Sequence, residues 1–404
     1  MKLLFITGLY PPQQIENLTA QSRGRIQNAP NVFQWGFIEG LNDNHIDYEV
    51  ISLPFLPSYP LNYMHLYTPS DNIYYNEQRI GEMLSYCDLL VYKAYSIRMA
   101  CERGIKRWLD KNKYCEDKLV ILTYTPYVPF LKAIRSIKKK YPNIIVASIV
   151  TDLVDNSLDF ASNRSILKRI QCQIDIIETK SCYKYIDKYI LLAQPMIEKI
   201  PEAIGKYIII EGISTQRKSF KTKKATNLLS ILYTGTLQEF SGVRQLLDAF
   251  MKIDNEHARL IICGTGYLND KIKESAEIDK RIIYKGKVSR EEALTLQKEA
   301  TLLINPRRPD GDITRYSFPS KTMEYMSSGT PMIGYKLEGI PSEYYNYYYT
   351  IDDLSEEELI KTLEYVLALP ISDLNTKADL AFDFVMTNKT AKIQLKKVID
   401  FVQS

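Results

Sequence analysis

Two charged side chains three residues apart indicate a site for chemistry near the carboxyl end of the chain. Lys321 and Glu324 follow a long polar loop within residues 305–331, NPRRPDGDITRYSFPSKTMEYMSSGTP. The spacing predicts a short helix with both side chains on one face. With Ser320 as N-cap and Gly329 as C′ residue, such a helix offers unpaired N–H groups and a positive dipole end to a diphosphate.

These residue types suit a nucleotide diphosphate. Lys321 would hold a phosphate, while Glu324 would accept hydrogen bonds from ribose hydroxyls. The expected phosphate site is completed by the backbone at the helix start and by an arginine that follows the preceding strand: Ser317, Phe318, Pro319, Ser320 and Arg307. An ion pair between Lys321 and Glu324 on a solvated helix face is the alternative explanation of the spacing.

The elements that must position these residues form two successive α/β series. Short apolar runs alternate with stretches whose apolar residues recur every three or four positions, which predicts parallel sheets covered by helices. We expect strands at residues 3–7, 48–53, 89–92, 119–123, 144–150, 189–192 and 207–210, with helices at 32–41 and 97–109. The second series begins at Leu229, includes a helix at 245–253, and is followed by helices at 374–385 and 391–402.

The repeated series predicts an α/β fold of two facing Rossmann-like domains with a cleft between them. Residues 1–212 would form the amino-terminal, acceptor-binding domain. Residues 213–227 would form a linker, because QRKSFKTKKATN is basic and lacks periodicity. Residues 228–372 would form the ligand-binding carboxyl-terminal domain, and residues 373–404 would form helices that pack back toward the first domain.

Over its carboxyl-terminal half the chain resembles the retaining glycosyltransferases of family 4, which have fold B and include enzymes of capsule and exopolysaccharide assembly. The similar blocks are YTGTLQEFSGVRQLLDAF, CGTG, YKGKVS and YSFPSKTMEYMSSGTPMI. The resemblance implies transfer of a sugar from a UDP- or GDP-linked donor to a glycan or lipid-linked acceptor in surface polysaccharide synthesis. It also implies that Glu324 is the ribose-binding glutamate. The strand-end turns expected beside the donor contain Gly235, Thr236, Gly264 and Gly266.

Two departures from that family's pattern keep other functions open. The first glutamate of the glutamate, seven residues, glutamate motif falls on Tyr316, and the usual Arg and Lys pair is represented by Thr236 and Ser241. The diphosphate would then depend on Arg307, Arg308, Arg315 or Lys321, and Lys321 and Arg307 are favoured because the first lies at the helix start and the second directly follows the strand end. A nucleotide-sugar epimerase of the same fold and a degenerate, non-catalytic partner in glycan assembly are the alternatives.

Asp152 is the candidate catalytic residue of the amino-terminal half, where it follows the strand expected at 144–150. A carboxylate at the end of a parallel strand can polarise an acceptor hydroxyl or stabilise positive charge at the anomeric carbon. A structural cap at the strand end is the alternative role for this aspartate.

The amino-acid composition excludes several kinds of partner and cofactor. A formal net charge of +4 without an Arg-rich arm argues against nucleic acid. Cysteines and histidines are scattered and the DGD at 310–312 suits a turn, so we expect no metal and no cofactor. No apolar run is long enough to span a bilayer, which predicts a cytoplasmic protein. Basic helical faces at 98–107 and 132–140 are solvated surfaces or peripheral contacts to anionic membrane.

Overall fold

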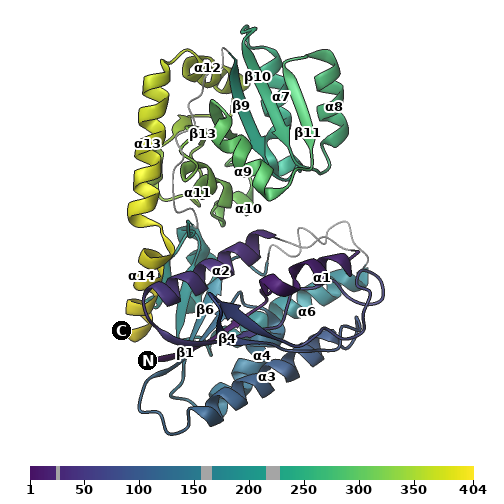
Figure 1. Ribbon diagram of the computed structural model, residues 1–404, viewed down its shortest axis with the longest axis vertical. Coiled ribbons are helices and arrows are strands. Elements are labelled where there is room, and N and C mark those ends of the chain that lie inside the picture. Colours follow the sequence, from purple (N-terminus) through teal and green to yellow (C-terminus); the bar gives the residue numbers. More distant parts are fainter. Residues whose placement is uncertain (24–27, 156–165, 215–227) are drawn as a thin grey trace. The chain divides into compact units, whose positions relative to one another are not determined.

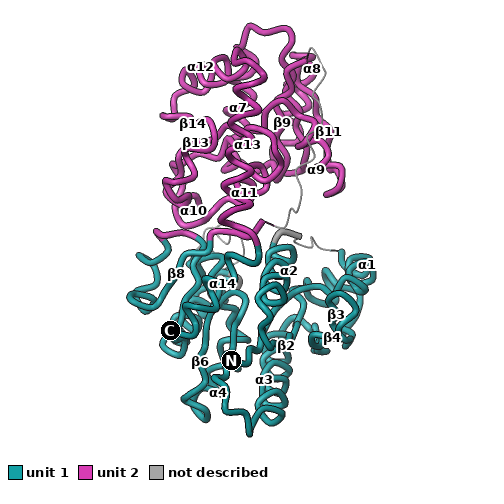
Figure 2. The backbone as a smooth tube through the Cα atoms, turned by 60° about the vertical axis from the view of Figure 1, so that its left-hand side comes forward, with its two compact units in different colours: residues 1–192, 196–210, 391–404 teal, residues 193–195, 211–390 magenta. Residues whose placement is uncertain are grey.

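The computed structural model describes residues 1–23, 28–155, 166–214 and 228–404. The chain divides into two units, each with its own sheet (Figure 2). Unit 1 comprises residues 1–192, 196–210 and 391–404, and unit 2 comprises residues 193–195 and 211–390. Most of the linker expected at 213–227 lies outside the described residues.

Unit 1 contains an eight-stranded sheet in the order β3-β4-β2-β1-β5-β6-β7-β8. Every neighbouring pair is parallel except β3 and β4. The strands are β1 (Lys2–Thr7), β2 (Asp47–Ser52), β3 (Asp71–Tyr75), β4 (Gln78–Met83), β5 (Leu119–Tyr124), β6 (Ile145–Val150), β7 (Lys188–Leu191) and β8 (Tyr207–Ile209). The central strands β1, β5 and β6 are buried from their second residue onward, as expected for a sheet covered on both faces.

Two groups of helices cover that sheet. One group pairs α2 (Asn28–Asp43) with α14 (Ala391–Gln403), and the other consists of α3 (Lys93–Lys111), α4 (Val128–Lys140) and α6 (Ile166–Tyr183). Figure 1 shows α2 and the α3–α4 pair on opposite faces, with the short α1 (Ile15–Ala20) nearby. Because α3, α4 and α6 each follow a parallel strand, their amino ends lie at the carboxyl edge of the sheet.

Unit 2 contains a six-stranded sheet in the order β11-β10-β9-β12-β13-β14, in which all pairs are parallel. Its strands are β9 (Leu229–Thr234), β10 (Ala258–Cys263), β11 (Ile282–Gly286), β12 (Leu302–Asn305), β13 (Met332–Tyr335) and β14 (Tyr349–Ile351). Its helices are α7 (Val243–Met251), α8 (Asn269–Ile278), α9 (Arg290–Glu299), α10 (Asp312–Arg315), α11 (Ser320–Met326), α12 (Glu356–Leu367) and α13 (Ile371–Asn388). The expected fold class of two Rossmann-like α/β domains is confirmed.

One predicted strand is wrong. Residues 89–92 form a turn before α3, with a single bridge between Leu89 and Tyr59. Besides β1, the strand that pairs with β2 is β4. Neither β4, which reads QRIGEM, nor its antiparallel partner β3, which reads DNIYY, was predicted, because neither is a continuous apolar run. Asn76 and Glu77, with φ of 47° and 66°, form the two-residue turn between them, a geometry that favours a tight hairpin.

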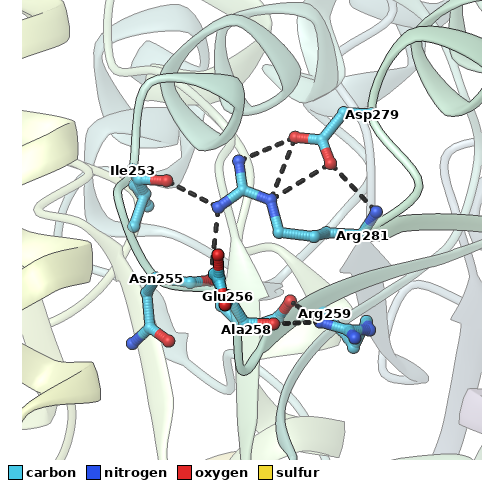
Figure 3. A network of polar contacts seen from close by, with 7 residues as sticks. All are labelled: Ile253, Asn255, Glu256, Ala258, Arg259, Asp279 and Arg281. Carbon is cyan, nitrogen blue, oxygen red and sulfur yellow. Dashed lines mark hydrogen bonds and ion pairs between the residues drawn. The ribbon is translucent and has the colours of Figure 1, made fainter.

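A guanidinium secures the amino edge of the unit 2 sheet. Arg281, just before β11, donates from Nη1 to the carbonyls of Ile253 (2.6 Å) and Asn255 (3.2 Å). Its Nη2 lies 2.7 Å from Asp279 Oδ2, and hydrogen bonds from Arg281 hold the pKa of that carboxyl below its usual range. Figure 3 shows this network, which ties the turn after α7 to the start of β11.

A buried ion pair joins two of the places where the chain passes from one unit to the other, near residues 211 and 390. Glu211 follows β8 and Lys389 follows α13; both are only 5% exposed, and Lys389 Nζ contacts Glu211 Oε1. Glu211 also accepts from Tyr344 Oη (2.7 Å), and Lys389 contacts Glu343 (2.9 Å). The backbone N–H of Ser214 donates to the Lys389 carbonyl at 2.8 Å. Both crossing segments are thereby fixed to one polar cluster within unit 2.

Candidate functional site

The loops at the carboxyl edge of the unit 2 sheet approach one another at glycines. Gly264 follows β10 with φ of +140°, and a Cβ on it would lie 1.7 Å from the Gly235 carbonyl oxygen after β9. A Cβ on Gly266 would lie 2.4 Å from the carbonyl oxygen of Leu237. The predicted strand-end turns at Gly235, Thr236, Gly264 and Gly266 therefore pack together, since no side chain separates the two backbones.

Lys321 in the first turn of α11 extends to the end of β9. A Cβ on Gly235 would lie 2.1 Å from Lys321 Cε and 2.2 Å from Nζ, so the ammonium group lies directly against this glycine. Nζ is also 5.4 Å from the centre of the Tyr233 ring. The close approach leaves a positive charge beside the turn after β9, partly accessible to solvent.

Arg307 adds a second positive charge near this end of the sheet, against the ring of Phe240. Its Nε donates to Thr314 Oγ1 (3.1 Å), its Nη2 donates to Ser317 Oγ (3.0 Å), and its guanidinium lies 5.8 Å from the Phe240 ring. Burial raises the pKa of Tyr233, and the nearby Arg307 charge opposes that increase. Lys321 and Arg307 thus converge on Tyr233, at an edge where parallel sheets commonly bind ligands.

Glu324 is held by α9. Its Oε1 accepts from Gln297 Nε2 (2.7 Å), and its Oε2 lies 3.7 Å from Arg290 Nη1. Gln297 is fully buried and also donates to Thr234 Oγ1 (3.0 Å), the last residue of β9. Glu324 and Lys321 therefore have different partners, on α9 and at Gly235, although they lie on one helix face.

Gln297 was missed at the sequence level. It occupies a polar position in EEALTLQKEA, and nothing in that pattern distinguishes it from its solvated neighbours. Its significance comes from the packing of α9 beside α11, which brings residues 27 positions apart into contact.

The helix caps expected around α11 are wrong in detail. Ser320 is the first helical residue, Pro319 occupies the N-cap position, and no side-chain cap forms. The helix ends at Met326 with Ser327 as C-cap, so Gly329, with φ of +73°, comes one residue later than expected. Pro319 fits this place because its φ of −69° is the value that its ring imposes and because it carries no N–H that would need a partner.

The other residues that the sequence analysis singled out lie in the loop between β12 and α11. Tyr316, which stands where the resembled family has its first glutamate, is buried, with the Arg315 guanidinium 5.4 Å from its ring. Phe318 packs edge-on against Tyr344, with ring centres 5.5 Å apart. Asp310 pairs with Arg308 at 3.0 Å, and the described residues contain no group of three potential metal-binding side chains.

Asp152 lies in unit 1, at the carboxyl edge of its sheet. It is exposed, two residues beyond β6, and its charge adds to burial in raising the pKa of Tyr124. The neighbouring Thr151 hydroxyl donates to Thr125 Oγ1 at 3.3 Å, and Thr125 has the uncommon φ of 60°. Asp152 and the Lys321 cluster belong to different units, so their expected position across one cleft stays a prediction.

Comparisons with known proteins define the class. Residues 229–368 match the family model described as Glycosyl transferases group 1. No curated protein sequence matches the chain. The fold resembles sucrose-phosphate synthase from Thermosynechococcus elongatus, with a TM-score of 0.65 and 14% identity over 100% of this chain and 99% of that one. It also resembles TarM of S. aureus (0.59, 10%, all of both chains) and the lipopolysaccharide outer core galactosyltransferase WaaB (0.58, 13%, 100% and 99%).

The family match covers the segment that contains Lys321, Glu324, Arg307 and the strand-end glycines. Residues 229–368 therefore match a group 1 glycosyl transferase domain, and the chain as a whole has the fold of these solved structures, with two Rossmann-like domains. At identities this low, the structural comparisons establish the fold alone. No helix among the described residues is long and apolar enough to cross a membrane.

Proposed function

We propose that unit 2 binds the nucleotide diphosphate of a UDP- or GDP-linked sugar. The observation that carries the proposal is the convergence of Lys321 and Arg307 on Tyr233, beside the backbone turn at Gly235. Two cations at one strand end match the charge of a diphosphate, and Arg307 provides a planar set of N–H donors. The backbone at residues 317–320 supplies further donors at the start of α11.

Glu324 is the proposed partner of the ribose hydroxyls. One carboxylate oxygen is fixed by Gln297, and the carboxylate is part exposed, so it retains lone pairs for ligand hydroxyls. The donor sugar would be transferred with retention of configuration to a glycan or lipid-linked acceptor bound by unit 1, in the synthesis of a surface polysaccharide. This finer assignment rests on the resemblance to family 4 described above.

Calorimetry with UDP and GDP tests the donor site. Saturation at a hundred times the dissociation constant would also raise the folding stability by about 2.7 kcal/mol in a thermal shift. Binding of neither nucleotide contradicts the proposal. With the donor known, sugar transfer measured in excess chelator should persist, because the described residues offer no metal site.

The same assay separates the alternative functions. An epimerase converts its donor without any acceptor, whereas a transferase produces linked sugar only when an acceptor is present. A non-catalytic partner binds nucleotide and converts nothing. Retention is read from the anomeric coupling of the product by NMR.

We predict that Gln297→Leu raises the KM for the donor by about tenfold with a small change in kcat, the expected loss for one hydrogen bond to a charged group. Glu324 would lose the amide that orients it, so binding suffers more than chemistry. The effect should largely disappear in a Glu324→Ala background, since the two residues act through one contact. Equal losses in both backgrounds would show that Gln297 does not act through Glu324.

Asp152→Asn should keep the donor affinity but lower kcat by about tenfold or more, because the amide preserves shape and removes the charge that faces the reaction. Asp155→Asn is the matched control: Asp155 is a nearby aspartate paired with Lys180 at 2.9 Å. Full turnover by Asp152→Asn with a verified acceptor would remove this residue from the mechanism. A lower melting temperature without ligand would indicate a structural cap.

A further inference from the structure

Unit 1 exposes large apolar side chains on two adjacent segments, residues 61–67 and 89–95, which we call the apolar platform. Its exposed members are Leu61, Met64, Leu66, Tyr67, Leu89, Leu90, Val91, Tyr92 and Tyr95. Val91 at the turn before α3 is 90% exposed. So dense a group is uncommon on a soluble surface and marks a place where another surface binds.

The two segments are firmly joined. The Tyr59 N–H donates to the Asp88 carbonyl (3.1 Å), and the Asp88 N–H donates to the Leu66 carbonyl (2.7 Å). Beneath them, the buried Asp88 carboxylate lies 2.6 Å from Lys93 Nζ, which also contacts the Leu56 carbonyl. The apolar side chains therefore project from an anchored base, and their exposure is a fixed property of the fold.

A second exposed apolar stripe lies on α6. The segment 89–95 of the platform follows β4, at the sheet edge that also carries Asp152, and the amino ends of α3, α4 and α6 share this edge. Tyr127, at the start of α4, is affected by charges on both sides: burial raises its pKa most, and Asp175 of α6 and Asp88 add to the increase. On α6 an exposed stripe at helical spacing consists of Ile166, Ile170, Ile174 and Ile177.

Basic side chains border the two segments of the platform, although the exposed Asp152 lies at the same sheet edge. Neither segment, LNYMHLY or LLVYKAY, contains an aspartate or a glutamate. Arg23 is exposed beside the first segment, where its backbone N–H donates to the Asn62 carbonyl (2.9 Å), and Arg98 lies one helical turn after Tyr95. Leucine and valine flanked by tyrosines and cations match the order of acyl chain, interface and anionic headgroup in a bilayer.

We propose that the apolar platform seats unit 1 on an anionic lipid bilayer. Leu90 and Val91 would enter the acyl region, the tyrosines would lie at the interface, and the exposed Arg23 would face the headgroups. The platform adjoins the sheet edge of Asp152, so this seat would present a lipid-linked acceptor to that edge. That last consequence rests on the proposed function, whereas bilayer binding itself does not.

Sedimentation with sucrose-loaded vesicles tests whether the apolar platform binds a lipid bilayer. The wild-type chain should sediment with vesicles of phosphatidylcholine and phosphatidylglycerol, more weakly with phosphatidylcholine alone, and less as salt is raised. Leu90→Asp with Val91→Asp should reduce the bound fraction by about tenfold, because charged groups are costly in the acyl region. Tyr114→Asp is the control: Tyr114 is 88% exposed but lies near the amino end of β5, at the other sheet edge.

Other results would overturn the proposal. If the wild-type protein stays in the supernatant with both types of vesicle, the apolar platform does not bind a bilayer. Equal loss in the Tyr114→Asp control would attribute binding to net charge alone. Dimerisation in analytical ultracentrifugation that the Leu90→Asp, Val91→Asp variant abolishes, without vesicle binding, would assign the platform to a second copy. Nucleotide affinity measured on the same proteins keeps the two proposals separate, because vesicle binding without nucleotide binding refutes only the donor site.

Discussion

Replacing Lys321 by alanine is expected to weaken nucleoside diphosphate binding by about tenfold to a hundredfold, the value of one hydrogen bond to a charged group. The loss of kcat should be larger, about 10²- to 10³-fold, because the ammonium group would stabilise charge that develops on the departing phosphate. Affinity for the bare nucleoside should hardly change. Calorimetry with nucleoside, nucleoside diphosphate and donor separates these effects.

Gly235→Ala provides an independent test of the same contact without removing any charge. The new methyl group would lie 2.1 Å from Lys321 Cε, so the side chain must leave its place beside Tyr233. We expect a loss of diphosphate affinity in the same direction as for Lys321→Ala. Gly311→Ala is the matched control, because a Cβ there meets only Thr314 Oγ1 at 3.8 Å. Wild-type diphosphate affinity in both Lys321→Ala and Gly235→Ala would show that the phosphate site lies elsewhere.

Lys389→Met is expected to lower the free energy of unfolding by about 3–5 kcal/mol, because it leaves the Glu211 carboxylate buried without its cation. For a unit of this size the melting temperature should fall by roughly 6 to 20 °C. Glu211→Gln combined with Lys389→Met should recover much of the loss, since neither buried charge remains. Lys336→Met, which removes one exposed partner of Asp352, should have little effect.

The pH dependence of the free energy of unfolding shows whether the ion pair between Glu211 and Lys389 stabilises the fold. Burial alone would raise the pKa of Glu211, but the charge of Lys389 and its hydrogen bond outweigh burial and lower it below 4.5. In the wild type the pair therefore stabilises the fold above about pH 4.5, and this contribution is lost as the pH falls through the folded-state pKa. In Lys389→Met burial dominates, so the stability gap to wild type should narrow on acidification. A gap that is constant from neutral pH to about pH 4 would contradict the role of the ion pair.

The two sheets could be predicted from the sequence because parallel strands buried on both faces read as continuous apolar runs. The run at 89–92 misled for a physical reason: its side chains are apolar, yet they are exposed on the platform, and periodicity does not report burial. Lys321 and Glu324 were found because their spacing fixes a shared helix face. Their separate partners, Gly235 and Gln297, depend on how loops and helices pack, which no local pattern encodes.

The Arg281 network has a consequence for experiments that alter the loops of unit 2. Arg281 donates hydrogen bonds to two main-chain carbonyls at one end of the unit 2 sheet. These bonds do not depend on which side chains stand at positions 253 and 255. The loop at residues 306–319 lies at the opposite end, so replacing it leaves that anchorage untouched. A variant with a different loop at these residues can therefore be assayed for nucleotide binding while the Arg281 contacts of the sheet stay in place.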